Sequence, residues 1–186
     1  NPQRECRVMK PASTQTLLDE LLDFGRRFGH GLDRLRDTDG PELATTPRDI
    51  IHREDKLALY RYRPRVATPL KTPVLIVYSL VNRPTMIDLE PDRSLVRGLL
   101  DAGLDVYLID WGYPDRADRL LALEDYVCGY LHGCVETICA RHALPAITVL
   151  GICQGGVLGL AYAALHPARV RHLITMVTPV DFHVPE

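Results

Sequence analysis

The sequence lacks the features that mark several large classes of protein. No apolar run approaches the roughly 20 residues of a membrane-spanning helix. The N-terminal stretch NPQRECRVMKPAST has no apolar core of a signal peptide. The formal net charge of −2 shows no bias toward nucleic acid or anionic membranes. Repeats and low-complexity tracts are absent, so the 46% apolar and 25% charged residues favour a soluble globular protein.

Cysteine is present, but not in the patterns of a disulfide framework or a zinc site. The count is odd and no C-x-x-C pair occurs, which favours a reducing cytoplasm and no bound metal. The chain also begins without Met, so we expect it to be trimmed or a fragment. Its cysteines are Cys6, Cys128, Cys134, Cys139 and Cys153.

Two regions differ in pattern, 1–47 and 48–186. Apolar spacing predicts an amphipathic helix over 14–35, followed by a polar, turn-rich linker over 36–47. This helix would either pack on the main domain or dock a partner or a hydrophobic surface. We expect packing on the domain, because such spacing is common in ordinary core-facing helices.

The second region, 48–186, alternates strand and helix patterns. Strands are predicted at LALYRYR and over 73–81, 104–111, 146–152 and 170–180, and helices over 92–103, 123–138 and 154–166. Apolar strands that alternate with helices indicate βαβ units. The predicted fold class is therefore α/β, with a mostly parallel sheet covered by helices on both faces.

The stretch ITVLGICQGGVLGL carries the strongest candidate for chemistry. Cys153 lies between a predicted strand and a predicted helix, in a G-x-C-x-G pattern. Gly151, Gly155 and Gly156 would let the helix cross close to the strand, and the helix N-terminus would favour a thiolate. A buried, inert cysteine is the alternative, and Cys128, Cys134 and Cys139 fit that alternative better. We therefore predict Cys153 as a nucleophile.

Two backbone N–H groups are candidates for an oxyanion hole. The first is that of Gln154, directly after the nucleophile, and the second lies near Val81, in the loop after an earlier strand. Arg83 in the same loop is either a substrate-facing cation or a solvated charge, and the sequence does not separate the two.

A base for Cys153 is hard to find among the seven histidines. His166 would be about 20 Å away along one helix, and His172 begins the next strand at the opposite edge. His183 and Asp181 follow that strand at the catalytic edge, but we interpret them as a loop, because the usual order places the base after further strands. The other histidines belong to the long helix or precede the sheet core (His30, His52, His132, His142).

We therefore expect the acid and the base outside this sequence, and a core that is incomplete at its C-terminus. The strand after the nucleophile would be left as an apolar edge. The chain by itself is expected to show little or no turnover.

Several motifs together resemble one enzyme family. EDKLALYRY, LIVYSLVNRP, DVYLIDWGYPD, LGICQGG and TMVTPVDF occur in order from about Glu54 to Phe182. They resemble the N-terminal half of the catalytic subunit of class III poly(3-hydroxyalkanoate) synthases. GICQGG resembles the class III form of the lipase-like box of that family.

This resemblance implies an α/β-hydrolase core and a Cys–His–Asp triad. Cys153 matches the nucleophile that carries the acyl group as a thioester while 3-hydroxyacyl-CoA, such as 3-hydroxybutyryl-CoA, is polymerised with release of CoA. Asp88 matches a family aspartate near the site entrance, with a loop or helix-capping carboxylate as the alternative. The triad His and Asp are implied downstream of Glu186.

The resemblance also implies the setting of the enzyme. It implies a homodimer, a second non-catalytic subunit, cytoplasmic localisation on polyester granules, and no cofactor beyond the CoA of the substrate. Two other functions stay open: a cysteine-dependent hydrolase or thioesterase, and a non-catalytic binding partner.

Overall fold

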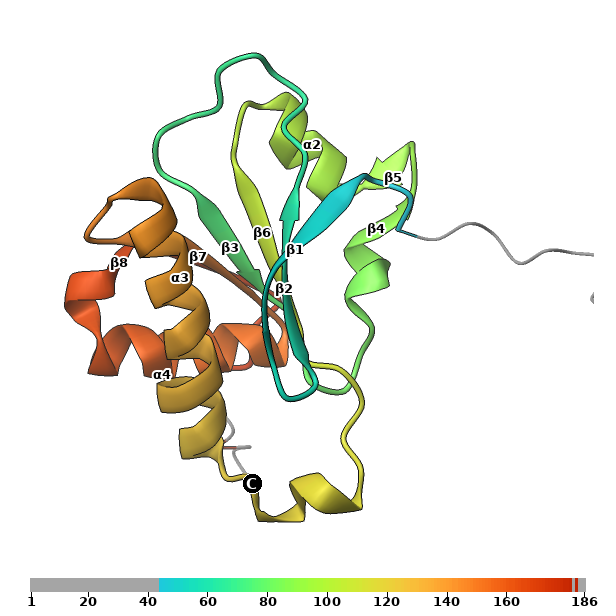
Figure 1. The fold of residues 1–186 in the computed structure, drawn as a ribbon. Helices are drawn as coiled ribbons and strands as arrows, with labels where there is room; N and C mark the ends of the chain where they lie inside the picture. The colour runs from blue at the N-terminus through green and yellow to red at the C-terminus, as the bar shows by residue number, and fades with distance from the viewer. Residues whose placement is uncertain (1–43, 182, 184–186) are drawn as a thin grey trace, which may run out of the picture. The chain divides into compact units, whose positions relative to one another are not determined.

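The computed structural model describes residues 44–181 and 183 and shows a central six-stranded sheet (Figure 1). The strand order is β1-β2-β6-β3-β7-β8. Strand β2 runs antiparallel to its neighbours β1 and β6, whereas β6, β3, β7 and β8 pair in parallel. The carboxyl ends of these four parallel strands therefore meet at one edge of the sheet. The strands are β1 Arg48–Glu54, β2 Leu57–Tyr62, β3 Val74–Val77, β6 Val106–Asp110, β7 Ile147–Ile152 and β8 Val170–Met176.

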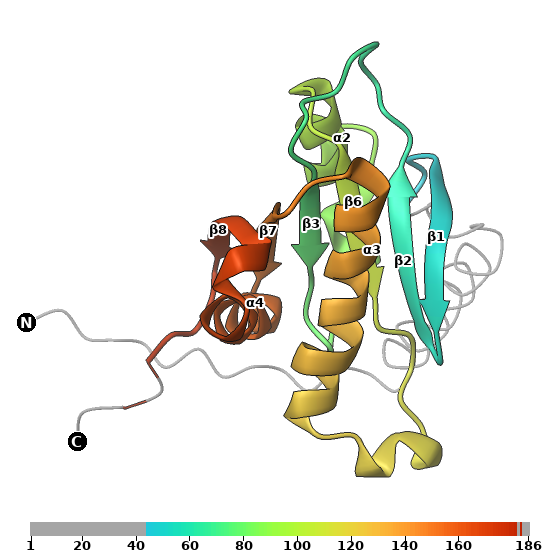
Figure 2. The ribbon, with the colours of Figure 1, turned by 60° about the vertical axis from the view of Figure 1, so that its left-hand side comes forward.

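The central strands are apolar on both faces because helices cover both faces (Figure 2). Every residue of β3 and β7 is buried. One core layer joins the sheet to α3 (His132–His142) and α4 (Gln154–Leu165), and a second joins it to α2 (Leu95–Asp101). Within β3, Leu75 and Val77 belong to the first layer and Val74 and Ile76 to the second, as strand alternation requires.

Short elements connect these strands and helices. A 3-10 turn, Pro84–Ile87, follows the loop after β3, and a small ladder of β4 (Asp88–Glu90) and β5 (Arg93–Ser94) precedes α2. A second 3-10 turn, Arg116–Leu120, follows β6, and a π-helical segment, Asp125–Leu131, runs directly into α3. A third 3-10 turn, Pro167–Arg169, joins α4 to β8.

The predicted α/β class is confirmed, but the observed strands are shorter than the predicted ones, and two of them are shorter by four or more residues. The strand predicted over 73–81 ends at Val77, because the backbone beyond it bonds to other groups at the carboxyl edge. The strand predicted over 170–180 ends at Met176, and Val177 has φ 47°, which breaks the extended conformation. Strand β1 was not predicted, and the first part of the predicted long helix is π-helical.

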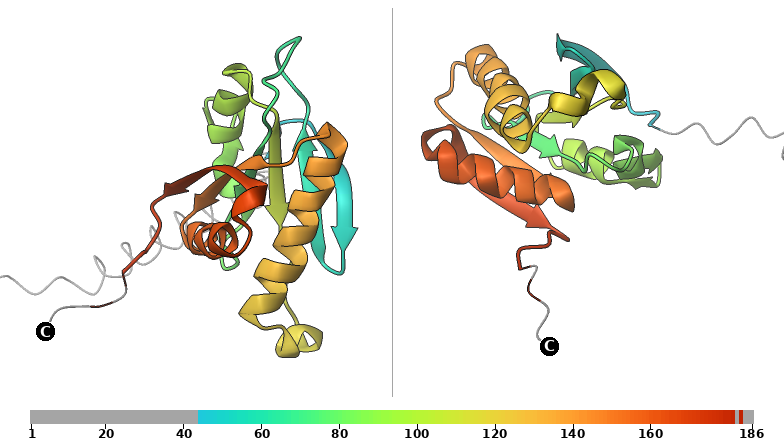
Figure 3. Two further views of the ribbon diagram at one scale, coloured as in Figure 1. Left: turned by 90° about the vertical axis from the view of Figure 1, so that its left-hand side faces the viewer. Right: turned by 90° about the horizontal axis from the view of Figure 1, so that it is seen from below.

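Strand β8 lies at one end of the sheet and β1 at the other (Figure 3). Ile174 of β8 is half exposed, and Val177 and Val180 beyond it are exposed. This agrees with the predicted apolar edge strand. The helix predicted over 14–35 lies outside the described residues, and the division at 47/48 stays a prediction. Within 44–181, no helix is both long and apolar enough to cross a membrane.

Candidate active site

Cys153 occupies the turn between β7 and α4. Its backbone has φ 55° and ψ −126°, a region that residues other than glycine rarely adopt, and its side chain is half-buried. The Cys153 N–H donates to the Met176 carbonyl of β8 at 2.9 Å, which ties the turn to the neighbouring strand. The strand–turn–helix geometry predicted around Cys153 is therefore present.

The three predicted glycines permit this turn by close backbone contact. A Cβ atom on Gly155 would lie 2.0 Å from the carbonyl oxygen of Val77, at the end of β3. On Gly151 it would lie 2.4 Å from the Cα of Gly156, and on Gly156 it would lie 1.9 Å from the Thr178 hydroxyl. Because none of these positions has room for a methyl group, the elbow requires glycine at each of them.

The Cys153 thiol faces the layer of core that contains α2. It packs against this layer together with Tyr78, which lies just past the end of β3. Burial, and then the nearby charge of the Cys153 thiolate, raise the pKa of the Tyr78 phenol, so this ring stays neutral at ordinary pH. The thiol also lies at the first turn of α4, where no side chain caps the helix. Unpaired N–H groups and the positive end of the helix dipole are thus next to the sulfur.

The loop after β3 lies against this elbow through a short hydrogen-bond network. The Leu80 N–H donates to Gln154 Oε1 at 3.1 Å, and the Ser79 hydroxyl donates to the same oxygen at 3.3 Å. The Val81 N–H, the predicted second oxyanion donor, donates to Ser79 Oγ at 3.2 Å. Val81 is therefore placed in the predicted loop, with its N–H engaged by a hydroxyl.

Arg83 extends from the same loop over an aromatic ring. Its guanidinium carbon lies 3.2 Å from the centroid of the Tyr113 ring, a cation–π contact. Both residues line an open cleft of about 430 Å³ between the loops that follow β3 and β6. Among residues 44–181, no carboxylate forms an ion pair with Arg83. This position is compatible with the substrate-facing interpretation of Arg83.

Asp88 is buried, with 1% of its surface exposed. Its carboxylate accepts hydrogen bonds from the Thr46 hydroxyl at 2.7 Å, the Thr46 N–H at 3.2 Å and the Ser94 hydroxyl at 2.5 Å. Ser94 in turn accepts the Arg97 N–H at 3.0 Å and caps α2. The geometry matches the structural alternative for Asp88, a carboxylate that supports a helix cap, and gives it no open face toward substrate.

The described histidines contact groups other than Cys153. His142 contacts the Tyr107 hydroxyl, His132 the Tyr162 hydroxyl and His172 the Thr148 hydroxyl, at 2.9, 3.0 and 3.2 Å. His166 caps the far end of α4 and stacks on His132, while His52 lies 3.6 Å from Glu54.

The pair predicted as a loop beyond β8 is also separate from the elbow. His183 Nδ1 lies 3.0 Å from Asp181 Oδ1, and both side chains are exposed. The His183 backbone N–H and then its ring lower the pKa of Asp181. Within residues 44–181 and 183, no imidazole forms a hydrogen bond with the Cys153 thiol.

The other described cysteines lie on the long helix, in two kinds of environment. Cys134 and Cys139 are buried, and burial raises the pKa of both thiols, that of Cys134 to about 12. Cys128 is exposed, contrary to the buried position expected for it, whereas Val127 and Leu131 of the same π-helical segment are buried. Cys153 is thus the described cysteine that combines partial exposure with a helix N-terminus.

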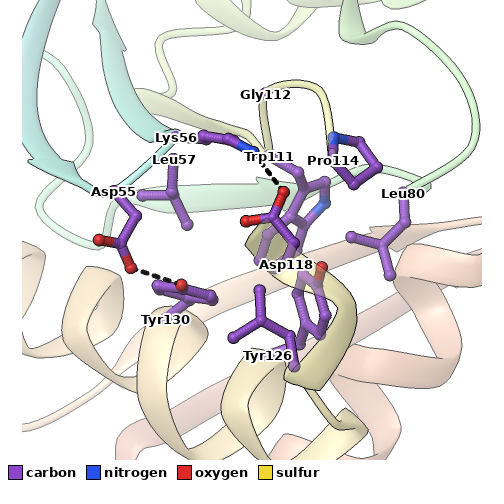
Figure 4. Close-up of a pocket in the computed structure, with 11 residues that line it drawn as sticks. Asp55, Lys56, Leu57, Leu80, Trp111, Gly112, Pro114, Asp118, Tyr126 and Tyr130 are labelled. Atoms are coloured by element: carbon purple, nitrogen blue, oxygen red, sulfur yellow. Dashed lines mark hydrogen bonds and ion pairs between the residues drawn. The ribbon is translucent and has the colours of Figure 1, made fainter. Parts of the chain in front are cut away.

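A cavity of about 50 Å³ lies beside the loop that carries Leu80 (Figure 4). Trp111, Tyr126 and Leu80 line it, and two polar pairs border it. Lys56 bonds to Asp118, and the Tyr130 hydroxyl donates to Asp55 at 2.6 Å. The space is far smaller than an acyl-CoA, so we interpret it as packing behind the loop.

Sequence reasoning missed the side-chain role of Gln154, and it missed Ser79 and Trp111 altogether. The Trp111 indole N–H donates to the Tyr78 carbonyl at 3.0 Å and so holds the beginning of the loop. The sequence did carry a signal, namely a glutamine directly after the nucleophile, but the prediction concerned only the backbone N–H of that residue.

The chain belongs to the α/β-hydrolase fold family, whose model matches residues 72–186. Residues 31–99 match a second family model, described as the N-terminus of poly-beta-hydroxybutyrate polymerase (PhaC). The predicted fold and the predicted family resemblance are both confirmed.

Individual relatives agree with these matches. The chain is 52% identical to a poly(3-hydroxyalkanoate) polymerase subunit PhaC of Thiocystis violacea, over 91% of this chain and 48% of the relative. It is 51% identical to the subunit of the same name from Synechocystis, over 96% and 49%. The chain spans about half the length of the curated relatives it matches.

Among solved structures, the Francisella virulence factor BioJ is similar in fold. The TM-score is 0.56 at 18% identity, over 86% of this chain and 52% of that one. An identity this low supports the fold alone.

Proposed function

We propose that the chain carries the nucleophile of a poly(3-hydroxyalkanoate) synthase. The observation that carries this proposal is Cys153 itself, held at φ 55° between β7 and α4 in a chain 52% identical to a polymerase subunit. A strained backbone of this kind persists only where the surrounding structure fixes it, and such sites cluster where chemistry occurs.

The proposed reaction has two acyl transfers. In the first, the Cys153 thiolate attacks the thioester carbonyl of 3-hydroxybutyryl-CoA or a close relative, and a carbon–sulfur bond forms. The tetrahedral oxyanion collapses and expels CoA thiolate, which takes up the proton that Cys153 released. In the second, a 3-hydroxyl group gives its proton to the base and its oxygen attacks the enzyme thioester. An ester bond forms, the carbon–sulfur bond breaks, and the Cys153 sulfur leaves as a thiolate that takes up that proton. The backbone N–H groups of Gln154 and Val81 would stabilise each oxyanion.

Cysteine suits this chemistry better than serine. Exchange of a CoA thioester for an enzyme thioester is nearly balanced in energy, so the acyl group stays activated for the hydroxyl. We propose that no cofactor is needed beyond the CoA of the substrate. The base and acid would come from a region that corresponds to the half of the relatives not matched by this chain.

Arg83 is proposed to meet the phosphates of CoA in the cleft beside Tyr113. Arg83→Gln should raise KM for 3-hydroxybutyryl-CoA by about tenfold, the typical effect of one charge-assisted hydrogen bond. The same substitution should leave KM unchanged for the N-acetylcysteamine thioester, which lacks phosphates. An equal rise in KM for both thioesters would contradict this role.

The decisive experiment incubates the full-length protein with 3-hydroxybutyryl-CoA and follows CoA release, polymer and the mass of the Cys153 peptide. We expect polymer and an acyl adduct on Cys153. Cys128→Ala is the matched control, because it removes an exposed cysteine outside the elbow and should keep the adduct. Free hydroxy acid without polymer would indicate a thioesterase, and absence of any adduct would indicate a binding role.

We further propose a homodimer, a second non-catalytic subunit and attachment to polyester granules in the cytoplasm. Support comes from the relatives, which are named as subunits of a polymerase. Co-purification of the full-length protein with a second chain, and its sedimentation with granules, would test this setting. A lone soluble monomer in producing cells would contradict it.

A further inference from the structure

The side chain of Gln154 joins the elbow to the loop after β3. Its Oε1 atom accepts the Leu80 N–H and the Ser79 hydroxyl, at 3.1 and 3.3 Å. A backbone N–H can only donate, so the atom that faces Leu80 must be the carbonyl oxygen of the carboxamide. The carboxamide of Gln154 therefore fixes two consecutive residues of the loop.

Ser79 passes this constraint on to Val81. Its hydroxyl donates to Gln154 Oε1 and at the same time accepts the Val81 N–H at 3.2 Å. The Ser79 side chain has 1% of its surface exposed, so its hydroxyl has little water to bond instead. The orientation of the Val81 amide is thus set, through one hydroxyl, by the residue that follows Cys153.

Two further contacts make the loop a rigid support for this network. The Trp111 indole holds the Tyr78 carbonyl at 3.0 Å. The Val77 carbonyl and the Tyr78 backbone occupy the position that a Cβ atom on residue 155 would need. The loop is thus held by α4 on one side and by the segment after β6 on the other.

We propose that Gln154 and Ser79 are positioning residues that hold the Val81 amide ready for the oxyanion of acyl transfer. This inference rests on the proposed role of Cys153 as nucleophile. While the site is empty, Ser79 Oγ occupies the Val81 N–H. When the tetrahedral oxyanion forms, its full negative charge is the stronger acceptor and takes that N–H from the neutral hydroxyl. Gln154 keeps Ser79 and Leu80 in place during this exchange.

The test compares two reactions of the same thiol in the full-length protein. An activated thioester acylates Cys153 through a tetrahedral oxyanion, whereas iodoacetamide alkylates it by displacing iodide and forms no oxyanion. Gln154→Leu removes the acceptor at similar volume, and should slow acylation roughly 30-fold, as expected when a catalytic donor is misplaced. Alkylation should change by less than about twofold, because thiol exposure and ionisation are retained.

Gln154→Glu keeps an acceptor oxygen at the same position. Its charge disfavours the thiolate equally in both reactions, so it should restore most of the ratio of acylation to alkylation. Thr137→Val, which removes a hydroxyl bonded within α3, is the matched control and should leave both rates unchanged. Equal loss of acylation and alkylation would show a merely structural role and overturn the inference, as would unchanged acylation in Gln154→Leu. Because the activated thioester needs no polymerisation, a protein that passes this test but makes no polymer would refute only the synthase proposal.

Discussion

Helices α2 and α4 pack on opposite faces of the central sheet, yet they begin in contrasting ways. Helix α2 begins after Ser94, at φ −124° and ψ 111°, and the Ser94 hydroxyl caps it with support from buried Asp88. Helix α4 begins after Cys153, at φ 55° and ψ −126°, with no side-chain cap. The first is the favoured start of a helix, and the second is a strained and open one.

The two helix starts therefore serve different purposes: that of α2 is structural, and that of α4 is suited to a reactive group. At α2, the Ser94 hydroxyl satisfies the Arg97 N–H of the first turn, so that group serves stability. At α4, the N–H groups next to the thiol remain available for a developing negative charge. The strain at Cys153 is sustained by packing, since glycine at 151, 155 and 156 allows the strand, the helix and the β3 loop to meet.

The sharpest test replaces the N-cap residue of α4 with alanine. Cys153→Ala should lower acyl transfer by at least about 10³-fold, because the nucleophile is lost. Its free energy of unfolding should change by less than about 1 kcal/mol, since no cap is removed. Polymer assays and urea unfolding of the full-length protein measure both effects. Retained transfer in Cys153→Ala would place the nucleophile elsewhere and remove the basis of the comparison.

Glycine-to-alanine substitutions in the two helices should have opposite signs. Gly155→Ala forces a methyl group to 2.0 Å from the Val77 carbonyl, and should destabilise the protein by about 3 kcal/mol or more. Gly98 lies within α2, and a Cβ there meets nothing within 4 Å. Gly98→Ala should therefore stabilise by about 0.5–1 kcal/mol. A mild effect of Gly155→Ala in urea unfolding would mean that the elbow is looser than its contacts indicate.

The sequence predicted the parts of this comparison that repeat a pattern. Alternating apolar segments revealed the parallel sheet, and G-x-C-x-G revealed the elbow with its glycines, because both depend on local spacing. The role of Asp88 could not be decided from sequence. Its burial depends on Thr46, 42 positions earlier, and on Ser94, and no local pattern reports such contacts.

The limits of the site prediction have a similar cause. Val81 was predicted at the last position of a strand over 73–81, next to the loop, whereas the strand ends at Val77 and Val81 lies within the loop. The Ser79 hydroxyl that accepts its N–H could not be found from the sequence. The predicted strand over 73–81 is long because its residues are apolar, whereas side-chain and backbone bonds at the sheet edge decide where β3 stops.

Asp88→Ala tests whether this carboxylate is structural. It removes the acceptor for Thr46 and Ser94, and should destabilise the protein by about 2–3 kcal/mol, because buried donors lose their partner. KM for the acyl-CoA should stay unchanged, since Asp88 has no open face toward the cleft. A higher KM with unaltered stability would instead support the substrate-site interpretation.

The smallest expected effect concerns the cap of α2 itself. Ser94→Ala should destabilise by about 1 kcal/mol, the usual loss for an N-cap hydroxyl, while Ser94→Thr keeps the oxygen and should restore most of it. The rate at which Cys153 reacts with iodoacetamide should be the same in both variants, because the cap contacts Arg97 and Asp88 and not the elbow. A change in thiol reactivity would show that the two helix starts are coupled through the sheet. Stability at one start and reactivity at the other would then no longer be independent properties of this fold.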